Sequence, residues 1–236
     1  MQHHGIVKKE SDETVKKYIL LFVITVLNFG CATIPFQETT LVSLETSDPL
    51  SVVEHFKENI PVNFQLLTTV VFEYNGRTFT GIGAIDIDSK NRTFKVACLN
   101  PMGVKLFEIS GNDLGVMTTY AVAALAKYEE LGATVGNDIR RIYFDLLPSQ
   151  NAPVWKRKYQ FVYQQFTRSG YMEYVFAGRE GDLMEKRYYE DHLLMWCVSY
   201  YEYQLQQGKR FPQGIIFDNY QYGYRLTVRQ KGKPLE

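Results

Sequence analysis

Side chains that could carry out catalysis or bind a metal ion are scarce in this sequence. Its four histidines and three cysteines do not have the spacing of a zinc site. The sequence also contains no Gly-x-Ser-x-Gly nucleophile motif. The stretch from Gly81 to Asp86 begins like a dinucleotide-binding loop, but it lacks the third glycine and strand-like residues follow it. Asp86 and Asp88 begin like a calcium loop, but Lys90 stands at the third ligand position. We therefore expect no metal site, no cofactor and no enzymatic activity.

Cys31 is the cysteine for which the sequence predicts a chemical modification. A basic stretch and an apolar run, residues 18–29, precede it, and with Gly30 they have the form of an export signal. An apolar helix of this length spans about 18 Å, less than the roughly 30 Å hydrocarbon core, which argues against the alternative of a transmembrane anchor. The Gly30-Cys31 pair resembles the lipobox of bacterial lipoproteins, in which the thiol carries a diacylglycerol. We expect residues 1–30 to be a removed signal peptide, and Ala32 in place of an aspartate to direct the protein to the outer membrane.

The turn Asn100-Pro101-Met102-Gly103 lies between two strand-like segments. Its Asn, Pro and Gly residues stand at the positions that a type I turn favours. Turn formation does not explain Met102, because its position accepts many polar residues. Two interpretations stay open: Met102 folds back onto the sheet, or it offers an apolar tip to a membrane or a lipidated partner.

The elements that would position these residues are mostly strands. Residues 31–47, rich in Thr and Glu, predict a linker, and a short helix with Asp48 as its cap is expected over 49–59. Apolar residues then alternate along the chain, and Asn75-Gly76 predicts a two-residue hairpin turn. We expect an antiparallel meander with strands at 63–74, 77–88, 93–99, 104–109 and 114–120.

The clearest helical pattern lies over 137–147. Asn137 is its expected N-cap and Pro148 its stop, and residues 122–131 are also rich in helix formers. One apolar stripe at helical spacing is formed by Ile139, Ile142, Tyr143 and Leu146.

The rest of the chain reads as strands separated by turns at 168–170, 178–181, 207–208 and 218–219. The fold class expected is therefore mainly β, with one curved antiparallel sheet and a few helices packed in or over its concave face. On one strand Phe94, Val96 and Cys98 alternate, and we expect them to face the cavity opposite the helical stripe.

Composition narrows the classes of partner. Hydrophobic residues make up 45% of the chain, charged residues 22%, and the net charge is zero, so a nucleic acid is not expected as a partner. Cys98 and Cys197 leave two alternatives, a disulfide in an oxidising compartment or two small buried apolar side chains.

Four features together resemble a known family. They are the Gly30-Cys31 pair, the stretch LNPMGVKLFEI around the turn, an apolar helix that ends at Pro148, and the stretch FPQGIIFDNYQYGYRLTV. These are similar to features of LolB-like outer-membrane lipoproteins of the lipoprotein-localisation system, or of a related family of uncharacterised bacterial lipoproteins. The resemblance implies an unclosed antiparallel β-barrel, formed by residues 48–236, whose helices plug a hydrophobic cavity. It also implies that Met102 stands where the family's protruding leucine contacts the membrane.

The resemblance implies a function as well. We expect a lipid-anchored protein on the periplasmic face of the outer membrane that receives acyl chains or lipidated proteins from a periplasmic lipoprotein carrier. It would then assist lipoprotein localisation or insertion. The alternative is a non-transporting envelope lipoprotein with a filled interior, which serves as a structural or interaction module of a neighbouring complex.

Overall fold

The computed structural model describes residues 34–232, so the expected signal peptide and the expected lipidation site, Cys31, lie outside the described residues. The helices are α2 (Pro49–Asn59), α3 (Ala123–Ala126) and α4 (Leu131–Tyr143). The strands are β1 (Asn63–Tyr74), β2 (Arg77–Asp88), β3 (Thr93–Leu99), β4 (Lys105–Asn112), β5 (Gly115–Ala121), β6 (Val154–Arg157), β7 (Gln160–Phe166), β8 (Gly170–Ala177), β9 (Asp182–Glu190), β10 (Leu193–Gln206), β11 (Lys209–Asn219) and β12 (Tyr224–Gln230).

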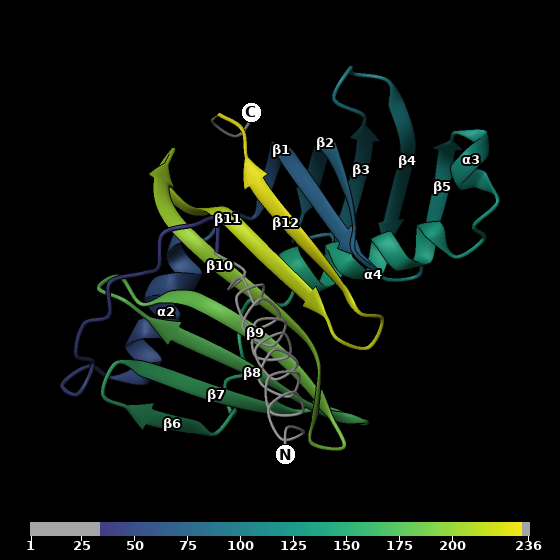
Figure 1. Ribbon diagram of the computed structural model, residues 1–236. Coiled ribbons are helices and arrows are strands. Elements are labelled where there is room, and N and C mark those ends of the chain that lie inside the picture. The colour runs from purple at the N-terminus through teal and green to yellow at the C-terminus, as the bar shows by residue number, and fades with distance from the viewer. Residues whose placement is uncertain (1–33, 233–236) are drawn as a thin grey trace, which may run out of the picture. The chain divides into compact units, whose positions relative to one another are not determined.

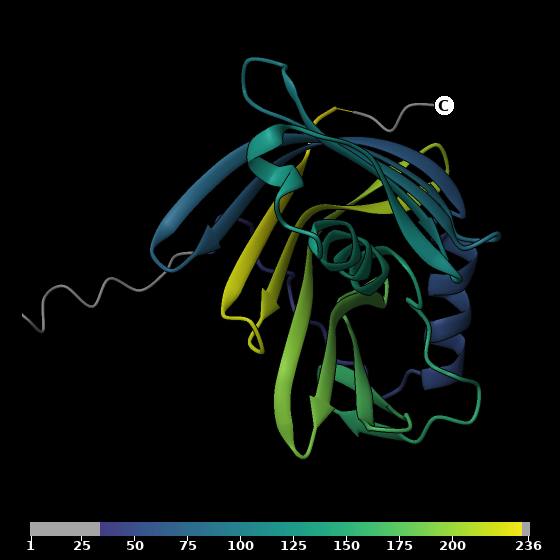
Figure 2. The same cartoon turned by 90° about the vertical axis from the view of Figure 1, so that its right-hand side faces the viewer.

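These strands form one antiparallel sheet that does not close into a barrel. Its order is β5-β4-β3-β2-β1-β12-β11-β10-β9-β8-β7-β6, so two meanders meet where β1 pairs with β12 (Figure 1). The sheet curves around α4, which Figure 2 shows nearly end-on within the curve. The expected mainly β fold, with an open antiparallel sheet and helices on its concave face, is confirmed.

Local turn chemistry sets the register of the hairpins. Asn75 and Gly76 have φ angles of +49° and +70°, as a two-residue type I′ turn requires, and β1 pairs with β2 residue by residue up to this turn. The turn expected at 218–219 is wrong, because β11 continues to Asn219. Asn219 is buried and donates to the Tyr224 hydroxyl at 3.0 Å, so it belongs to the sheet, and the chain turns at 220–223.

The first helix forms as expected. The Asp48 carboxylate accepts a hydrogen bond from the Ser51 N–H at 2.9 Å, and Pro49 occupies the first turn. Phe56 on its buried face packs edge-on against Phe176 of β8 and Tyr203 of β10. Thus α2 covers one end of the concave face.

The second long helix begins and ends earlier than expected. It runs from Leu131 to Tyr143 rather than over 137–147, and Asn137 lies in its interior instead of capping it. Its glycines permit the earlier start, because they let the helix lie close to β5. A Cβ at Gly136 would lie only 2.5 Å from Val116 Cγ2. The helix ends before Asp145, whose φ of +51° turns the chain away. Within residues 122–131, which are rich in helix formers, the structure forms the single turn α3, and α4 begins at Leu131.

Part of the expected linker packs on the domain. The Phe36 ring stacks on Tyr201 with centroids 5.3 Å apart, and it lies so close to Gly214 that a Cβ there would be 2.3 Å from the ring. Leu44 is buried, and its N–H donates to the Lys158 carbonyl at 2.8 Å. Residues 36–47 of the expected linker therefore follow the surface of the domain.

Candidate functional site

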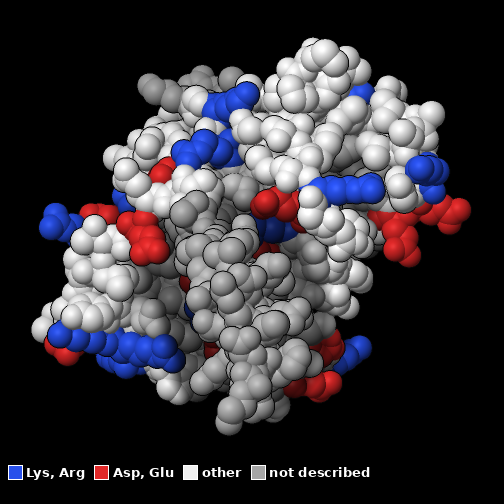
Figure 3. Space-filling view, viewed as in Figure 1, with Lys and Arg blue, Asp and Glu red and all other residues white. Residues whose placement is uncertain are grey.

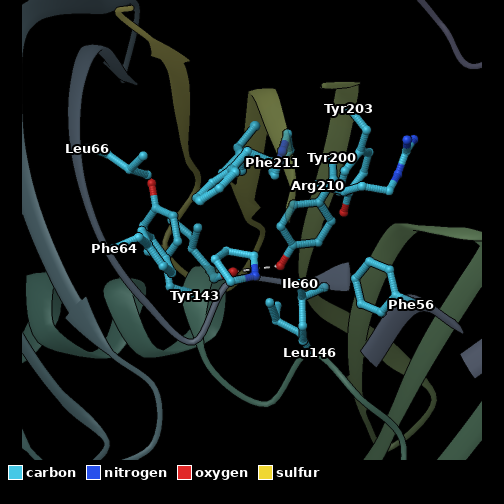
Figure 4. Close-up of a pocket in the computed structure, with 14 residues that line it drawn as sticks. Phe56, Ile60, Phe64, Leu66, Tyr143, Leu146, Tyr200, Tyr203, Arg210 and Phe211 are labelled. Atoms are coloured by element: carbon cyan, nitrogen blue, oxygen red, sulfur yellow. Dashed lines mark hydrogen bonds between the residues drawn. The ribbon is translucent and has the colours of Figure 1, made fainter. Parts of the chain in front are cut away.

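A cavity lies on the concave side of the sheet where α2 and α4 end, and we call it the α2–α4 pocket. Its volume is about 40 Å³ and its lining is almost entirely apolar. Figure 4 shows side chains from both helices, from β1 and from β10 and β11 converging on it. The two helices and the segments that follow them contribute Phe56, Ile60, Ile142, Tyr143 and Leu146, and β1 contributes Phe64.

The volume of the pocket limits what fits in it. An engineered cavity of roughly 150 Å³ takes up benzene, so a cavity of about 40 Å³ is too small for a long acyl chain. Ile60 and Pro61 lie between α2 and β1, and Leu146 lies beyond the end of α4; all three are half-buried and outside regular elements. A long acyl chain can therefore enter only if these connecting segments separate.

The last turn of α4 brings two side chains of the predicted stripe to the pocket. The Tyr143 ring lies 6.1 Å from that of Phe64 on β1. Tyr200 on β10 donates its hydroxyl hydrogen to the Ile142 carbonyl at 2.7 Å. Because that carbonyl belongs to the unpaired end of the helix, the bond fixes the helix end against the sheet.

Four residues with polar side-chain atoms line the pocket, and three of them are engaged elsewhere. Tyr200 bonds the helix end, and Tyr203 donates to the Leu183 carbonyl at 2.9 Å. The Arg210 guanidinium makes two bonds to Asp182, at 2.7 and 2.6 Å, and Figure 4 shows it turned away from the pocket. Tyr143 is the fourth of these residues.

The hydroxyl of Tyr143 has no hydrogen-bond partner among the residues that the structure describes. The side chain is 6% exposed, and Figure 4 shows its hydroxyl end directed toward Leu66. Burial raises the pKa of this phenol, so it remains a protonated donor. The pocket therefore combines an apolar lining with one uncommitted donor.

A buried lysine holds the end of α4 from the other side. Lys186 on β9 is 1% exposed and donates to the Phe144 carbonyl at 2.7 Å. Desolvation, with the nearby Arg92 charge, lowers its pKa to about 7 despite the opposing effect of Asp145. The side chain thus satisfies a helix-terminal carbonyl that would otherwise be buried without a partner.

A second polar contact anchors the middle of α4. The Asp138 carboxylate accepts from the Tyr224 hydroxyl at 2.6 Å and from Arg141 at 3.2 Å. Burial raises its pKa to about 6, although both hydrogen-bond partners oppose the shift. Arg141 also lies over the Trp196 ring, 5.6 Å from its centroid, so this face of the helix is held by polar and aromatic contacts together.

The Met102 turn has the geometry that its sequence predicts. The Gly103 N–H donates to the Asn100 carbonyl at 2.9 Å, and the Asn100 side chain accepts from the N–H groups of Met102 and Val104. Met102 does not have the positive φ that a type II turn would need, which leaves the expected type I geometry. Its side chain is 86% exposed, which excludes the interpretation that it folds back onto the sheet. Figure 3 shows a largely uncharged surface over the connection between β3 and β4.

The predicted cavity residues separate into two groups. Ile142, Tyr143 and Leu146 line the pocket, whereas Phe94, Val96 and Ile139 pack in the continuous core. Residues of the pocket wall that the sequence did not assign to a site include Tyr200, Tyr203, Arg210 and Phe211. Their strands carry a general excess of tyrosine, but no spacing in the sequence relates them to α4.

Cys98 and Cys197 are both free and buried. The disulfide alternative is therefore not realised. Burial raises the pKa of each thiol to about 11, so both remain protonated and behave as small apolar side chains.

Two kinds of feature are absent from residues 34–232. Within this range no three His, Cys, Asp or Glu side chains lie together as a possible metal site. No helix there has both the length and the apolar character needed to cross a membrane.

Comparison with known proteins gives a likeness of fold. A LolA superfamily protein from Nitrosomonas europaea superposes with a TM-score of 0.54 and 11% identity, over 83% of this chain and 94% of that chain. A proposed outer membrane lipoprotein-sorting protein domain from Vibrio parahaemolyticus gives 0.45 and 11%, over 78% and 90%. A DUF1329 family protein from Desulfovibrio piger gives 0.45 and 9%, over 79% and 92%. No protein-family model matches the sequence, and no curated protein matches it at a significant level.

The chain has a LolA-like fold, at a sequence identity that shows nothing beyond the fold. The narrower likeness to LolB, and the outer-membrane role it would bring, stay predictions.

Proposed function

We propose that this protein binds acyl chains or lipidated proteins in the α2–α4 pocket and passes them to a membrane, without catalysing a reaction. The observation that carries the proposal is the almost wholly apolar pocket on the concave face, between the ends of two helices. The LolA-like fold, which the LolA superfamily protein shares over most of this chain, also supports the proposal. The family that the sequence resembles has a hydrophobic cavity in an unclosed sheet of this kind. Anchoring through Cys31 at the outer membrane is part of the same proposal.

Binding in this proposal requires the pocket to widen, and the energetics allow it. Each methylene group moved from water to an apolar site contributes about 0.8 kcal/mol, so ten of them supply about 8 kcal/mol. Separating a few half-buried side chains such as Ile60 and Leu146 costs less, because a fully buried leucine is worth about 1.5–3 kcal/mol.

The Met102 turn supplies the membrane contact in this proposal. An 86% exposed methionine at the tip of a hairpin enters the hydrocarbon of a bilayer readily, and the adjacent Val104 is exposed as well. The turn is rigid, because the Asn100 side chain holds the N–H groups on either side of Gly103.

The proposal is tested by native mass spectrometry of the purified protein and by titration with the methyl ester of a fluorescent fatty acid. We expect a co-purifying lipid, or uptake of about one acyl chain per protein chain. Leu146→Trp should abolish uptake by filling the mouth of the pocket, whereas Leu50→Trp, on the exposed side of α2, should leave it unchanged. An empty protein that takes up no acyl ester would contradict the proposal.

The second candidate function is an interaction module without a ligand. The observation that favours it is the small volume of the pocket, about 40 Å³, since a filled interior needs no cargo. Failure of acyl-ester uptake, together with an unaltered fold, supports this candidate instead.

A further inference from the structure

We infer that the α2–α4 pocket recognises the carbonyl group of an esterified or amide-linked acyl chain, through a hydrogen bond donated by the Tyr143 hydroxyl. This inference rests on the proposed function and adds the chemical class of its ligand. It distinguishes acyl esters and amides from plain hydrocarbon and from free fatty acids.

The polar groups of the pocket are almost all committed to the protein itself. The side chains of Tyr200, Tyr203 and Arg210 each donate a hydrogen bond to another group of the protein. Tyr143 alone among the polar side chains that line the pocket has a hydroxyl without a partner in the described part of the chain. A ligand in the pocket therefore meets a single free donor.

The buried Tyr143 hydroxyl carries a cost in free energy. Burying a hydroxyl without a hydrogen bond destabilises a folded protein, and buried polar groups are satisfied in the great majority of cases. Phenylalanine would fill the same space against Phe64 without this cost. The tyrosine is therefore better suited to the pocket with a ligand than without one.

The protonated phenol selects the chemistry of the ligand. Satisfying the O–H of this phenol requires an acceptor, and the apolar lining favours an acceptor with hydrocarbon beside it. A free carboxylate would bring a negative charge into an apolar pocket, where Arg210 is already neutralised by Asp182. An uncharged ester or amide carbonyl satisfies the donor without that penalty.

A stability measurement tests the cost of the unpaired hydroxyl, and Tyr163 provides a matched control. The Tyr163 hydroxyl is also buried and without a partner among the described residues, but this residue does not line the pocket. In the ligand-free protein we expect Tyr143→Phe and Tyr163→Phe each to raise the melting temperature by about 2–4 °C. Tyr200→Phe should lower it, because its bond to the Ile142 carbonyl is lost. A lower melting temperature for Tyr143→Phe would show that the hydroxyl has a partner, and would overturn the inference.

A binding measurement tests the preference for an ester carbonyl. The probes are methyl dodecanoate, dodecanoate and an alkane of matching length, titrated against the full protein by displacement of a fluorescent apolar dye. Wild-type protein should bind the methyl ester about fivefold more tightly than the alkane, the value of one ordinary hydrogen bond. Tyr143→Phe should remove this preference and leave alkane affinity unchanged, whereas Tyr163→Phe should keep it.

The outcomes separate the inference from the proposed function. If wild type binds the three probes equally, or Tyr143→Phe keeps the ester preference, the inference fails while the proposed function stands. If wild type binds none of the probes, the proposed function fails and the inference with it. A diacylglyceryl lipopeptide and a phosphatidylethanolamine, titrated in the same way, show which source of acyl ester the pocket prefers.

Discussion

The helix α4 contacts the two halves of the sheet in different ways. Toward β5 it presents glycines, and a Cβ at Gly132 or Gly136 would lie 2.5 Å from a side-chain atom of Thr118 or Val116. Toward β9, β10 and β12 it is held by buried hydrogen bonds to the Phe144 and Ile142 carbonyls and to the Asp138 carboxylate. The first contact combines this close packing with hydrogen bonds at the surface, donated by the Arg140 guanidinium to the Asn112 and Gly115 carbonyls. The second contact depends on buried polar groups that must be satisfied.

This difference indicates which end of the helix can move. Close packing against glycine has no alternative arrangement, because any larger spacing leaves a void. Hydrogen bonds can be exchanged for others, and two of the groups involved, Lys186 and Asp138, have pKa values shifted toward neutrality. The C-terminal end of α4, which the buried polar groups hold, is also the end that carries Ile142 and Tyr143 into the pocket. We therefore expect the pocket to widen at this end, with the glycine contact as the fixed point.

The largest effect is expected at the glycine contact. Gly136→Leu should destabilise the domain by about 3 kcal/mol, because the side chain has no space beside Val116 and forces the helix away from β5. Urea unfolding measures the loss. The double variant Gly136→Ala, Val116→Ala should be more stable than Gly136→Ala alone, since it restores space at the same point. A loss below about 0.5 kcal/mol for Gly136→Leu would show that this side of the helix is not closely packed.

Lys186→Met tests the polar side and should cost about 2 kcal/mol, because it leaves the Phe144 carbonyl buried without a donor. The folded pKa of about 7 lies below the unfolded value of 10.5, so between these values the unfolded state binds more protons. In the wild type this lysine makes stability rise as pH increases from about 7 to 10.5, and makes it fall as pH drops back toward 7.

The measurement is the unfolding free energy of both proteins at several pH values in that window. The difference between wild type and Lys186→Met should grow as pH rises. A constant difference would mean that Lys186 keeps its ordinary pKa.

Asp138→Asn should lower the free energy of unfolding by less, about 1 kcal/mol. The contribution of this group to stability should change with pH in the opposite direction to that of Lys186. The folded pKa of about 6 lies above the unfolded value of 3.8, so the folded state binds more protons between them. The stability from this group is present below about 3.8 and is lost as pH rises through 6. Asparagine keeps an acceptor for Tyr224 but cannot titrate, so chemical unfolding of the variant should lack this component. An identical pH profile for the two proteins would contradict the assignment.

The smallest effect on stability is expected from Met102→Glu, which lies far from both contacts of α4. The side chain is 86% exposed, so the unfolding free energy should change by less than about 0.5 kcal/mol. Binding to lipid vesicles, followed by flotation, should weaken because a charge replaces the apolar tip. Met102→Leu is the control and should retain vesicle binding. A large loss of stability, or unchanged flotation, would remove the proposed membrane contact.

The same contrast explains what the sequence could and could not predict. Asn75-Gly76 and the Asp48 cap act through neighbouring residues, so their turn and helix were predicted correctly. The start of α4 was not, because Gly132 and Gly136 usually disfavour a helix and here are required by the strand beside them. Lys186 gives no sign of burial in the sequence, since lysine is normally exposed.

The residues of the candidate site also differ in how far the sequence predicts them. The apolar stripe with Ile142, Tyr143 and Leu146 was visible because helical spacing is local. The opposite wall comes from β10 and β11, far away in sequence, and no local pattern indicates which tyrosines on those strands meet the helix. The lack of a partner for the Tyr143 hydroxyl depends on how the helix packs against these strands, so only the structure shows it.

The most direct test of the central claim, that the α2–α4 pocket holds acyl chains, is photo-cross-linking. A methyl ester of a fatty acid that carries a diazirine on its chain is added to the purified protein, irradiated, and the labelled peptides are identified by mass spectrometry. We expect labels within α2 (Pro49–Asn59), on residues 142–146 and around Phe211, and their loss in Leu146→Trp. No labelling, or labels confined to surfaces outside the pocket, would contradict it.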